Sequence, residues 1–210
     1  MYVQMPGTTC PEPRPRRRDG APSGLGSPPG RTLASVRSPR LTMDGTRHTD
    51  VELMRLAVRV GDFLKRSERS IAAAESCTGG WIGKVLTDVP GSSEWFGTGF
   101  VAYSNSAKTA LLGVLQAELD EHGAVSEAVV KAMALGALER AQADIAVAVS
   151  GIAGPDGGTP GKPVGTIWLA WAWRRGKSLH VQARRKSFKG DREAVRRKAV
   201  HGALSGVLEI

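Results

Sequence analysis

Two short apolar runs constrain the fold of this chain most strongly. Residues Ile71–Ala74 and Ile145–Val149 contain no polar side chain. Such runs are typical of strands that are buried on both faces of a sheet. Helical patterns precede both runs, so helices and strands alternate in the first half of the chain. The sequence therefore predicts an α/β fold, a three-layer α/β/α single domain with a mixed β-sheet.

Spacing and capping signals predict the remaining elements. The segment Thr49-Asp50-Val51-Glu52 has the form of a capping box and precedes apolar residues at helical spacing. An alanine-rich helix is expected over 126–142, and strands over 164–173 and 179–188 are expected to pair as a hairpin. The other expected elements are helices over 78–89 and 107–112, a strand over 100–103, and a last helix that Asp191 caps.

The net charge of +9 is unevenly distributed along the chain. Residues 1–42 hold seven arginines against Glu12 and Asp19, which gives +5 and leaves +4 for residues 43–210. The same segment holds eight of the twelve prolines and few large apolar side chains, so it cannot bury enough surface to order itself. We expect a disordered extension over residues 1–45 and one domain over 46–210. The domain is only mildly basic, so nucleic acid is not an expected partner.

Cysteine usage and hydropathy limit the other classes. The two cysteines, Cys10 and Cys77, are too few and too far apart for a disulfide framework or a zinc site. No apolar run approaches the roughly 20 residues that span a bilayer, and the N-terminus lacks the apolar core of a signal peptide. We expect a cytoplasmic protein with no membrane partner, no metal and no cofactor.

The segment from Ala74 to Trp81, AESCTGGW, is the first candidate site. It places Ser76 where a strand gives way to a helix, a junction that exposes side chains and free backbone N–H groups together. Gly79 and Gly80 would let a substrate approach the backbone, whose N–H groups could stabilise an oxyanion or a phosphate. An ordinary helix cap by Ser76 or Thr78 is the alternative, and this segment alone does not decide between the two.

A serine nucleophile needs a neighbouring base. None of the four histidines has a glycine-rich or acidic context, so lysine is the other option, because burial can lower its pKa toward neutrality. Lys108 is the candidate, since a strand ending near Tyr103 and a capped helical turn would project it toward the site. The Tyr103 hydroxyl could hydrogen-bond Ser76 or Lys108. The alternative is a solvent-facing lysine.

A glycine-rich loop, Ser150–Gly158, follows the second buried run, at the kind of edge where ligand sites of α/β sheets concentrate. Neither this loop nor residues 78–85 match the phosphate-binding pattern G-x-x-x-x-G-K-[ST], which argues against a P-loop ATPase. Arg192 follows the expected cap Asp191; it could lie near a ligand phosphate or be an exposed neighbour of the cap.

Several separate motifs, in order from about Thr49 to the end of the chain, resemble the C-terminal domain of the CinA family, which also occurs as a free-standing nicotinamide mononucleotide deamidase. The matching motifs are AESCTGG (74–80), GSSEWF (91–96), GFVAYSNSAK (99–108), HGAVSE (122–127), SGIAGPDGG (150–158), KPVGT (162–166) and FKGDREAVR (188–196).

This resemblance implies an amidase that converts nicotinamide mononucleotide to nicotinate mononucleotide and ammonia. It implies Ser76 as nucleophile, Lys108 as base and Tyr103 as a supporting hydroxyl. On this basis the small-molecule nucleotide would be held by the two loops and their neighbours. The expected substrate-binding residues are Thr78, Gly79, Gly80, Asn105, Ser150, Gly151, Gly154, Asp156 and Arg192.

Three alternatives remain open at the level of the sequence. Cys77 is a rival nucleophile, because a thiolate at a helix N-terminus is activated by the helix dipole. A non-catalytic nucleotide-binding or DNA-binding accessory of competence or recombination is a function of a different class. The tryptophans at 168, 171 and 173 favour core or subunit-contact packing over base stacking, so a homo-oligomer is an open expectation.

Overall fold

The computed structural model describes residues 48–210, so the extension expected over residues 1–45 lies outside the described residues. In the described part a five-stranded sheet is flanked by helices. The helices are α1 (Asp50–Arg66), α2 (Trp81–Thr87), α3 (Asn105–Leu112), α4 (Gln116–His122), α5 (Glu127–Arg140) and α6 (Arg192–Val207), with a 3-10 turn, η1 (Ser92–Glu94). The strands are β1 (Ile71–Glu75), β2 (Phe96–Val101), β3 (Ile145–Gly151), β4 (Thr166–Arg175) and β5 (Ser178–Ser187).

The sheet is mixed, as the sequence predicts. Its strand order is β2-β1-β3-β4-β5. Strands β2, β1 and β3 run parallel, whereas β4 pairs antiparallel with β3 and forms the expected hairpin with β5. The carboxyl ends of the three parallel strands therefore meet at one edge, together with the start of β4.

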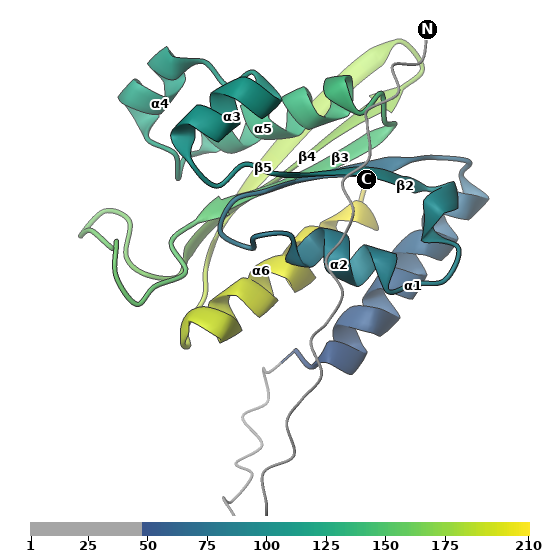
Figure 1. Cartoon of the computed structure of the whole chain (residues 1–210), viewed down its shortest axis with the longest axis horizontal. Helices are drawn as coiled ribbons and strands as arrows, with labels where there is room; N and C mark the ends of the chain where they lie inside the picture. The colour runs from purple at the N-terminus through teal and green to yellow at the C-terminus, as the bar shows by residue number, and fades with distance from the viewer. Residues whose placement is uncertain (1–47) are drawn as a thin grey trace, which may run out of the picture. The chain divides into compact units, whose positions relative to one another are not determined.

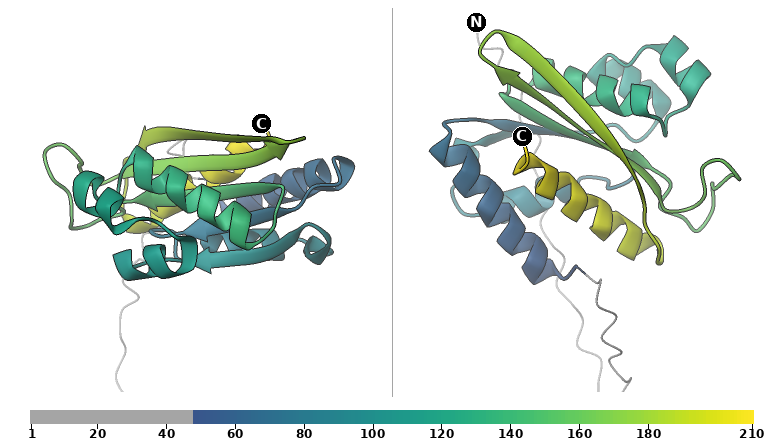
Figure 2. Two further views of the ribbon diagram at one scale, coloured as in Figure 1. Left: turned by 90° about the horizontal axis from the view of Figure 1, so that it is seen from above. Right: turned by 180° about the vertical axis from the view of Figure 1, so that it is seen from behind.

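Helices cover both faces of the sheet and give the predicted three layers. Figure 1 shows α3, α4 and α5 on one face and α1, α2 and α6 on the other. The two further views in Figure 2 show the same separation. In these views the loop between β3 and β4 extends from the sheet at the end where α6 begins.

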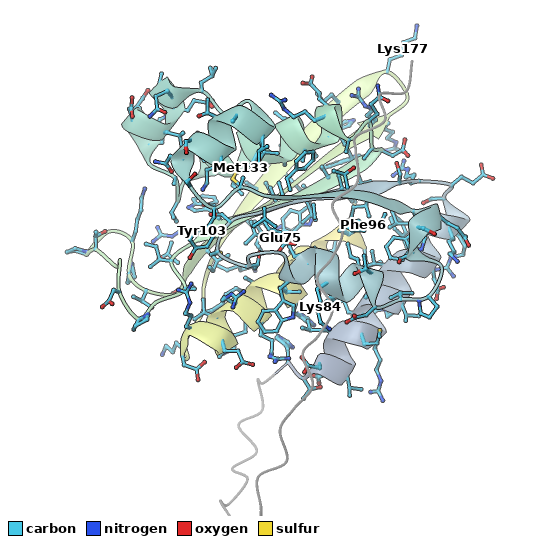
Figure 3. The ribbon with its side chains drawn as sticks, in the orientation of Figure 1. Glu75, Lys84, Phe96, Tyr103, Met133 and Lys177 are labelled. Carbon is cyan, nitrogen blue, oxygen red and sulfur yellow. The ribbon has the colours of Figure 1, made fainter. Side chains whose placement is uncertain are left out.

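The two faces of the sheet carry side chains of very different size. Toward α1, α2 and α6 the central strands present isoleucine, valine, leucine, Trp171 and Ala73. Toward α5 they present alanine at positions 72, 74, 146, 148, 170 and 172, with Trp168 near the start of β4. The fully buried Met133 of α5 packs against this face (Figure 3). Small side chains allow a helix to lie close to the sheet, so α5 is held against the alanine face.

Most predicted elements are confirmed, with shifted ends. The capping box at Thr49 is present and opens α1, and the Asp191 side chain caps α6. The helix expected over 78–89 is shorter, because Gly79 and Gly80 adopt φ of +61° and +93° and form a turn before Trp81. Strand β2 begins earlier than the expected 100–103 and ends before Tyr103. Helix α4 was not predicted, since it buries only Leu119.

The tryptophans of β4 pack within the domain, as their apolar bulk predicts. Trp171 is 1% exposed, and its indole N–H donates to the carbonyl of Ala203 at 2.8 Å. Trp168 packs against the alanine side of the core, and Trp173 stacks on His180 with ring centroids 5.2 Å apart.

Candidate functional site

The candidate site lies at the edge where the parallel strands end. Ser76 follows β1 directly, and its backbone N–H donates to the carbonyl of Val149 in β3 at 3.0 Å. On the other side, the N–H of Ala102, just after β2, donates to the carbonyl of Glu75 at 2.9 Å. These bonds extend the parallel ladder by one step and fix the backbone around Ser76. Ligand sites of α/β sheets concentrate at such edges.

Ser76 and Lys108 are brought together over 32 residues of chain. Lys108 lies in the first turn of α3, where the Ser104 side chain caps the helix by accepting from the N–H of Ala107 at 3.0 Å. Its Nζ lies 3.1 Å from the Oγ of Ser76. The capped turn thus projects the lysine toward the serine, as expected, and the solvent-facing alternative for Lys108 is wrong.

Burial controls the chemistry of Lys108. The side chain is 1% exposed, and none of the ion pairs among residues 48–210 includes it. Removal from water disfavours the ammonium form, so the pKa of Lys108 lies below its ordinary value of 10.5. A lysine with a lowered pKa can act as a base nearer to neutrality.

The other contacts of Lys108 orient its lone pair. Nζ also lies 3.1 Å from the carbonyl oxygen of Ala102 and 3.1 Å from that of Tyr103. A neutral amine has two N–H groups and one lone pair. If the two N–H groups donate to these carbonyls, the lone pair is left facing the hydroxyl of Ser76. This is the arrangement that a proton transfer from Ser76 to Lys108 requires.

A cavity of about 220 Å³ opens onto the pair. Of the expected binding residues, Asn105, Ser150, Gly151 and Arg192 line it, as do Ser76, Tyr103 and Lys108. Ala124 and Val125, in the loop between α4 and α5, also line it and were not singled out from the sequence. The Ser150 hydroxyl donates to the carbonyl of Ala124 at 2.6 Å and so ties this loop to the end of β3.

The other expected binding residues lie outside the cavity lining. Thr78 is fully buried, and Gly79 and Gly80 line a separate and larger hollow between α1, α2 and α6. Gly154 contributes its carbonyl, which accepts from Arg192 at 2.7 Å. Asp156 is exposed on the loop between β3 and β4.

Tyr103 is placed differently from the expectation. Its carbonyl, not its hydroxyl, contacts Lys108, and the hydroxyl pairs with the guanidinium of Arg192 at 3.1 Å. The expected bond from the hydroxyl to Ser76 or Lys108 is absent within the described part of the chain, because Tyr103 lies beyond the end of β2 with a 60% exposed side chain. In Figure 3 Tyr103 lies on the side of the molecule from which the loop between β3 and β4 extends.

Two charged residues that the sequence did not single out hold the turn after Ser76. Glu75 is 1% exposed, and its carboxylate accepts from the N–H groups of Gly80, Ile82 and Gly83 at 3.0, 3.0 and 2.9 Å. In Figure 3 it lies between the sheet and α2. Arg196 of α6 donates to the carbonyls of Cys77 and Thr78 at 3.1 and 2.6 Å.

These contacts determine which N–H groups of the turn remain available. The N–H of Gly80 is bound to Glu75, and that of Gly79 donates to the carbonyl of Ser76 at 3.1 Å. Among residues 48–210, the N–H groups of Cys77 and Thr78 have no protein acceptor. Of these two residues only Cys77 lines the cavity, so an oxyanion formed there would be stabilised at the N–H of Cys77 and not at the two glycines.

Cys77 is poorly suited to be the nucleophile. Its thiol is 6% exposed, and burial raises its pKa to about 12. At neutral pH the reactive thiolate is therefore almost unpopulated. This distinguishes Cys77 from Ser76, whose Oγ has the Nζ of Lys108 at hydrogen-bond distance.

The described residues offer neither a metal centre nor a membrane span. Within 48–210 no group of three or more histidine, cysteine, aspartate or glutamate side chains could hold a metal ion. No helix in the same range is long and apolar enough to cross a bilayer.

The fold and the site define a small three-layer α/β protein with a buried serine–lysine pair at the carboxyl edge of its sheet. Residues 53–210 match the CinA C-terminal domain. The chain belongs to the CinA C-terminal domain family.

Relatives and solved structures agree with this assignment. The nicotinamide-nucleotide amidohydrolase PncC of Escherichia coli is 56% identical over 156 residues, covering 74% of this chain and 93% of its own. The protein of the same name from Pseudomonas putida is 53% identical over 155 residues, with coverage of 74% and 94%. The crystal structure of a competence damage-inducible protein from Klebsiella pneumoniae superposes with a TM-score of 0.71 at 41% identity, covering 75% of this chain and 95% of that one.

Proposed function

We propose that this chain is an amidase that hydrolyses the carboxamide of nicotinamide mononucleotide to nicotinate mononucleotide and ammonia. The observation that carries the mechanism is the contact of 3.1 Å between Ser76 Oγ and the buried Nζ of Lys108 at the cavity. The choice of substrate rests on the amidohydrolase names of relatives that are more than half identical. A buried lysine without an ion-pair partner destabilises a protein, so a catalytic role accounts for its position.

The first half of the reaction transfers the acyl group to Ser76. Neutral Lys108 takes the hydroxyl proton while Oγ attacks the carboxamide carbon, and the carbonyl oxygen becomes an oxyanion. The N–H group of Cys77 stabilises that charge. Collapse re-forms the carbonyl and breaks the C–N bond. The proton on Lys108 passes to the departing nitrogen, which leaves as ammonia, and an ester on Ser76 remains.

The second half releases the acid. Lys108, neutral again, takes a proton from a water molecule whose oxygen attacks the ester carbon. The same N–H group holds the second oxyanion. Breaking the ester C–O bond frees nicotinate mononucleotide, and the proton returns from Lys108 to the Oγ of Ser76. The same groups therefore serve both halves, as microscopic reversibility of the proton transfers requires.

The size of the cavity indicates how the nucleotide would lie. At about 220 Å³ it is smaller than the roughly 300–1,000 Å³ of sites that enclose a whole drug-sized ligand. We assign it to the pyridine carboxamide, with the ribose phosphate extending toward the mouth. Arg192 lies there with a guanidinium suited to phosphate, and Asn105 offers an amide. Asp156, exposed and anionic, has no part in this arrangement.

The test is ammonia release from nicotinamide mononucleotide by the full chain. Ser76→Ala and Lys108→Ala should each lower kcat at least about a thousandfold, because members of a nucleophile–base unit fail together. Lys131→Ala is the matched control, since that lysine is a surface residue paired with Glu127 and should leave kcat unchanged.

Two outcomes would count against the proposal. Full activity in the Lys108 variant would remove the base from the mechanism. A wild-type protein that binds the nucleotide without releasing ammonia would favour the non-catalytic binding alternative.

A further inference from the structure

Glu75 and Arg196 both form hydrogen bonds that hold the turn Ser76–Gly80, one at each end. Glu75 comes from β1 and binds N–H groups at the start of α2, whereas Arg196 comes from α6 and binds two carbonyls of the turn. The N-cap position of α2 is Gly80, which has no side chain to cap the helix. The buried carboxylate of Glu75 takes over that task.

The contacts of Arg196 help to fix the direction of the N–H groups in the turn. In a trans peptide the C=O and the N–H point in opposite directions. Because Arg196 holds the carbonyl of Cys77, the N–H of Thr78 points away from α6. Because the carbonyl of Ser76 accepts from Gly79, the N–H of Cys77 points out of the turn. Of the two residues only Cys77 lines the cavity, and Arg196 fixes the peptide group that follows it.

Glu75 removes the competing donors. A turn that leads into a helix presents several free N–H groups, and an oxyanion could bind at any of them. The carboxylate accepts from Gly80, Ile82 and Gly83, so these are unavailable to a substrate. Its negative charge is neutralised locally by these three bonds and by the helix N-terminus, since none of the ion pairs in residues 48–210 includes it.

We propose that Glu75 and Arg196 are positioning residues that hold the turn so that the N–H of Cys77 faces the developing oxyanion. Neither residue contacts Lys108 Nζ or lines the cavity. The substrate used to test this inference comes from the proposed amidase function, whereas the contacts of Glu75 and Arg196 do not depend on that proposal. Loss of either residue should therefore reduce kcat and leave KM nearly unchanged.

The experiment compares matched substitutions at neighbouring arginines. Arg196 and Arg197 both stack on Trp81, with the guanidinium carbons 5.3 and 4.9 Å from the ring centroid. Only Arg196 reaches the turn, whereas Arg197 pairs with Asp50 and Glu193. Arg196→Lys keeps the charge but loses the forked geometry that binds two carbonyls. It should lower kcat at least tenfold, while Arg197→Lys stays within about twofold of wild type.

Glu75→Gln tests the hydrogen bonds between Glu75 and the start of α2. The amide nitrogen that replaces one carboxylate oxygen cannot accept, so at least one N–H of the α2 start loses its partner. We expect kcat to fall at least tenfold and KM to stay within about twofold. An unchanged kcat, or a rise in KM alone, would overturn the positioning role.

A second readout does not depend on the substrate. An alkyl fluorophosphonate is attacked by Ser76 Oγ at phosphorus, fluoride leaves, and the phosphoryl oxygen occupies the oxyanion position. Labelling of folded protein should slow in Arg196→Lys and Glu75→Gln but not in Arg197→Lys. Equal rates in all of these variants would overturn the proposal. Labelling that follows this pattern in a wild-type protein without turnover would support the positioning role and refute the assigned substrate.

Discussion

Gly136 couples the stability of the domain to the placement of Lys108. It lies in α5 against the C-terminal end of α3, and a Cβ added there would lie 1.8 Å from the carbonyl oxygen of Leu112. Leu112 is one helical turn beyond Lys108 in the same short helix. Replacing a helical glycine by alanine usually stabilises a protein by about 1 kcal/mol, but here the added methyl group meets backbone.

The size of the effect follows from the geometry. Real Cβ atoms essentially never approach another heavy atom within 3.0 Å, so Gly136→Ala must move the Leu112 carbonyl by about 1.2 Å. Overpacking of this kind costs about 1–3 kcal/mol, and the contact with backbone favours the upper end. After the helix gain is subtracted, a net loss of about 2 kcal/mol remains, or about 4–8 °C in Tm. A shift of about 1 Å at Lys108 should lower kcat about a hundredfold.

Thermal unfolding and ammonia release, both measured on the full chain, test this. Gly97→Ala is the matched control, because a Cβ at Gly97 meets no atom within 4 Å, and its Tm and kcat should stay near wild type. A Gly136→Ala protein that is as stable as wild type would refute the steric argument. A protein that is less stable but keeps its kcat at a temperature where it is folded would refute the coupling of α5 to Lys108.

Four further outcomes are expected. Because burial lowers the pKa of Lys108, activity should rise with pH through that pKa. Between the pKa of Lys108 in the folded protein and its value of about 10.4 in the unfolded chain, the unfolded chain binds more protons, so the free energy of unfolding should rise with pH across that window. Urea titrations of the Lys108→Met variant over the same pH range should lack this increase. Cys77→Ala should keep kcat within about threefold in the ammonia assay, since the pKa of about 12 leaves almost no thiolate. Trp171→Phe should lower the free energy of unfolding by about 1–3 kcal/mol in urea titration, because the carbonyl of Ala203 loses a buried donor. An unchanged free energy of unfolding would show that this hydrogen bond does not contribute to stability.

Local patterns predicted the fold and offered Ser76 and Lys108 as candidates, and the family resemblance implied their pairing. The apolar runs predicted β1 and β3, and their shared parallel edge placed Ser76 and the loop after β3 near one another. The capped turn at Ser104 predicted the projection of Lys108. Each of these signals lies within a few residues of the group that it places, which is why sequence reasoning could reach them.

The roles of Glu75 and Tyr103 could not be reached in this way. A glutamate that ends a buried strand gives no sign of which donors it meets, because those donors appear only when the turn over Gly79 and Gly80 closes. The direction of the Tyr103 hydroxyl depends on Arg192, which is 89 residues away. Contacts of this kind are set by tertiary packing and not by spacing.

The alanine face of the sheet also determines how the protein can evolve. A position filled by isoleucine or tryptophan can be changed to a smaller residue and repacked by its neighbours, but the six alanines beneath α5 can become smaller only as glycine. A side chain larger than cysteine there would lift α5, and with it α3 and the lysine that α3 carries. Variation should therefore accumulate on the face toward α1 and α6, while a saturation library at the six positions should return only alanine, glycine, serine and cysteine.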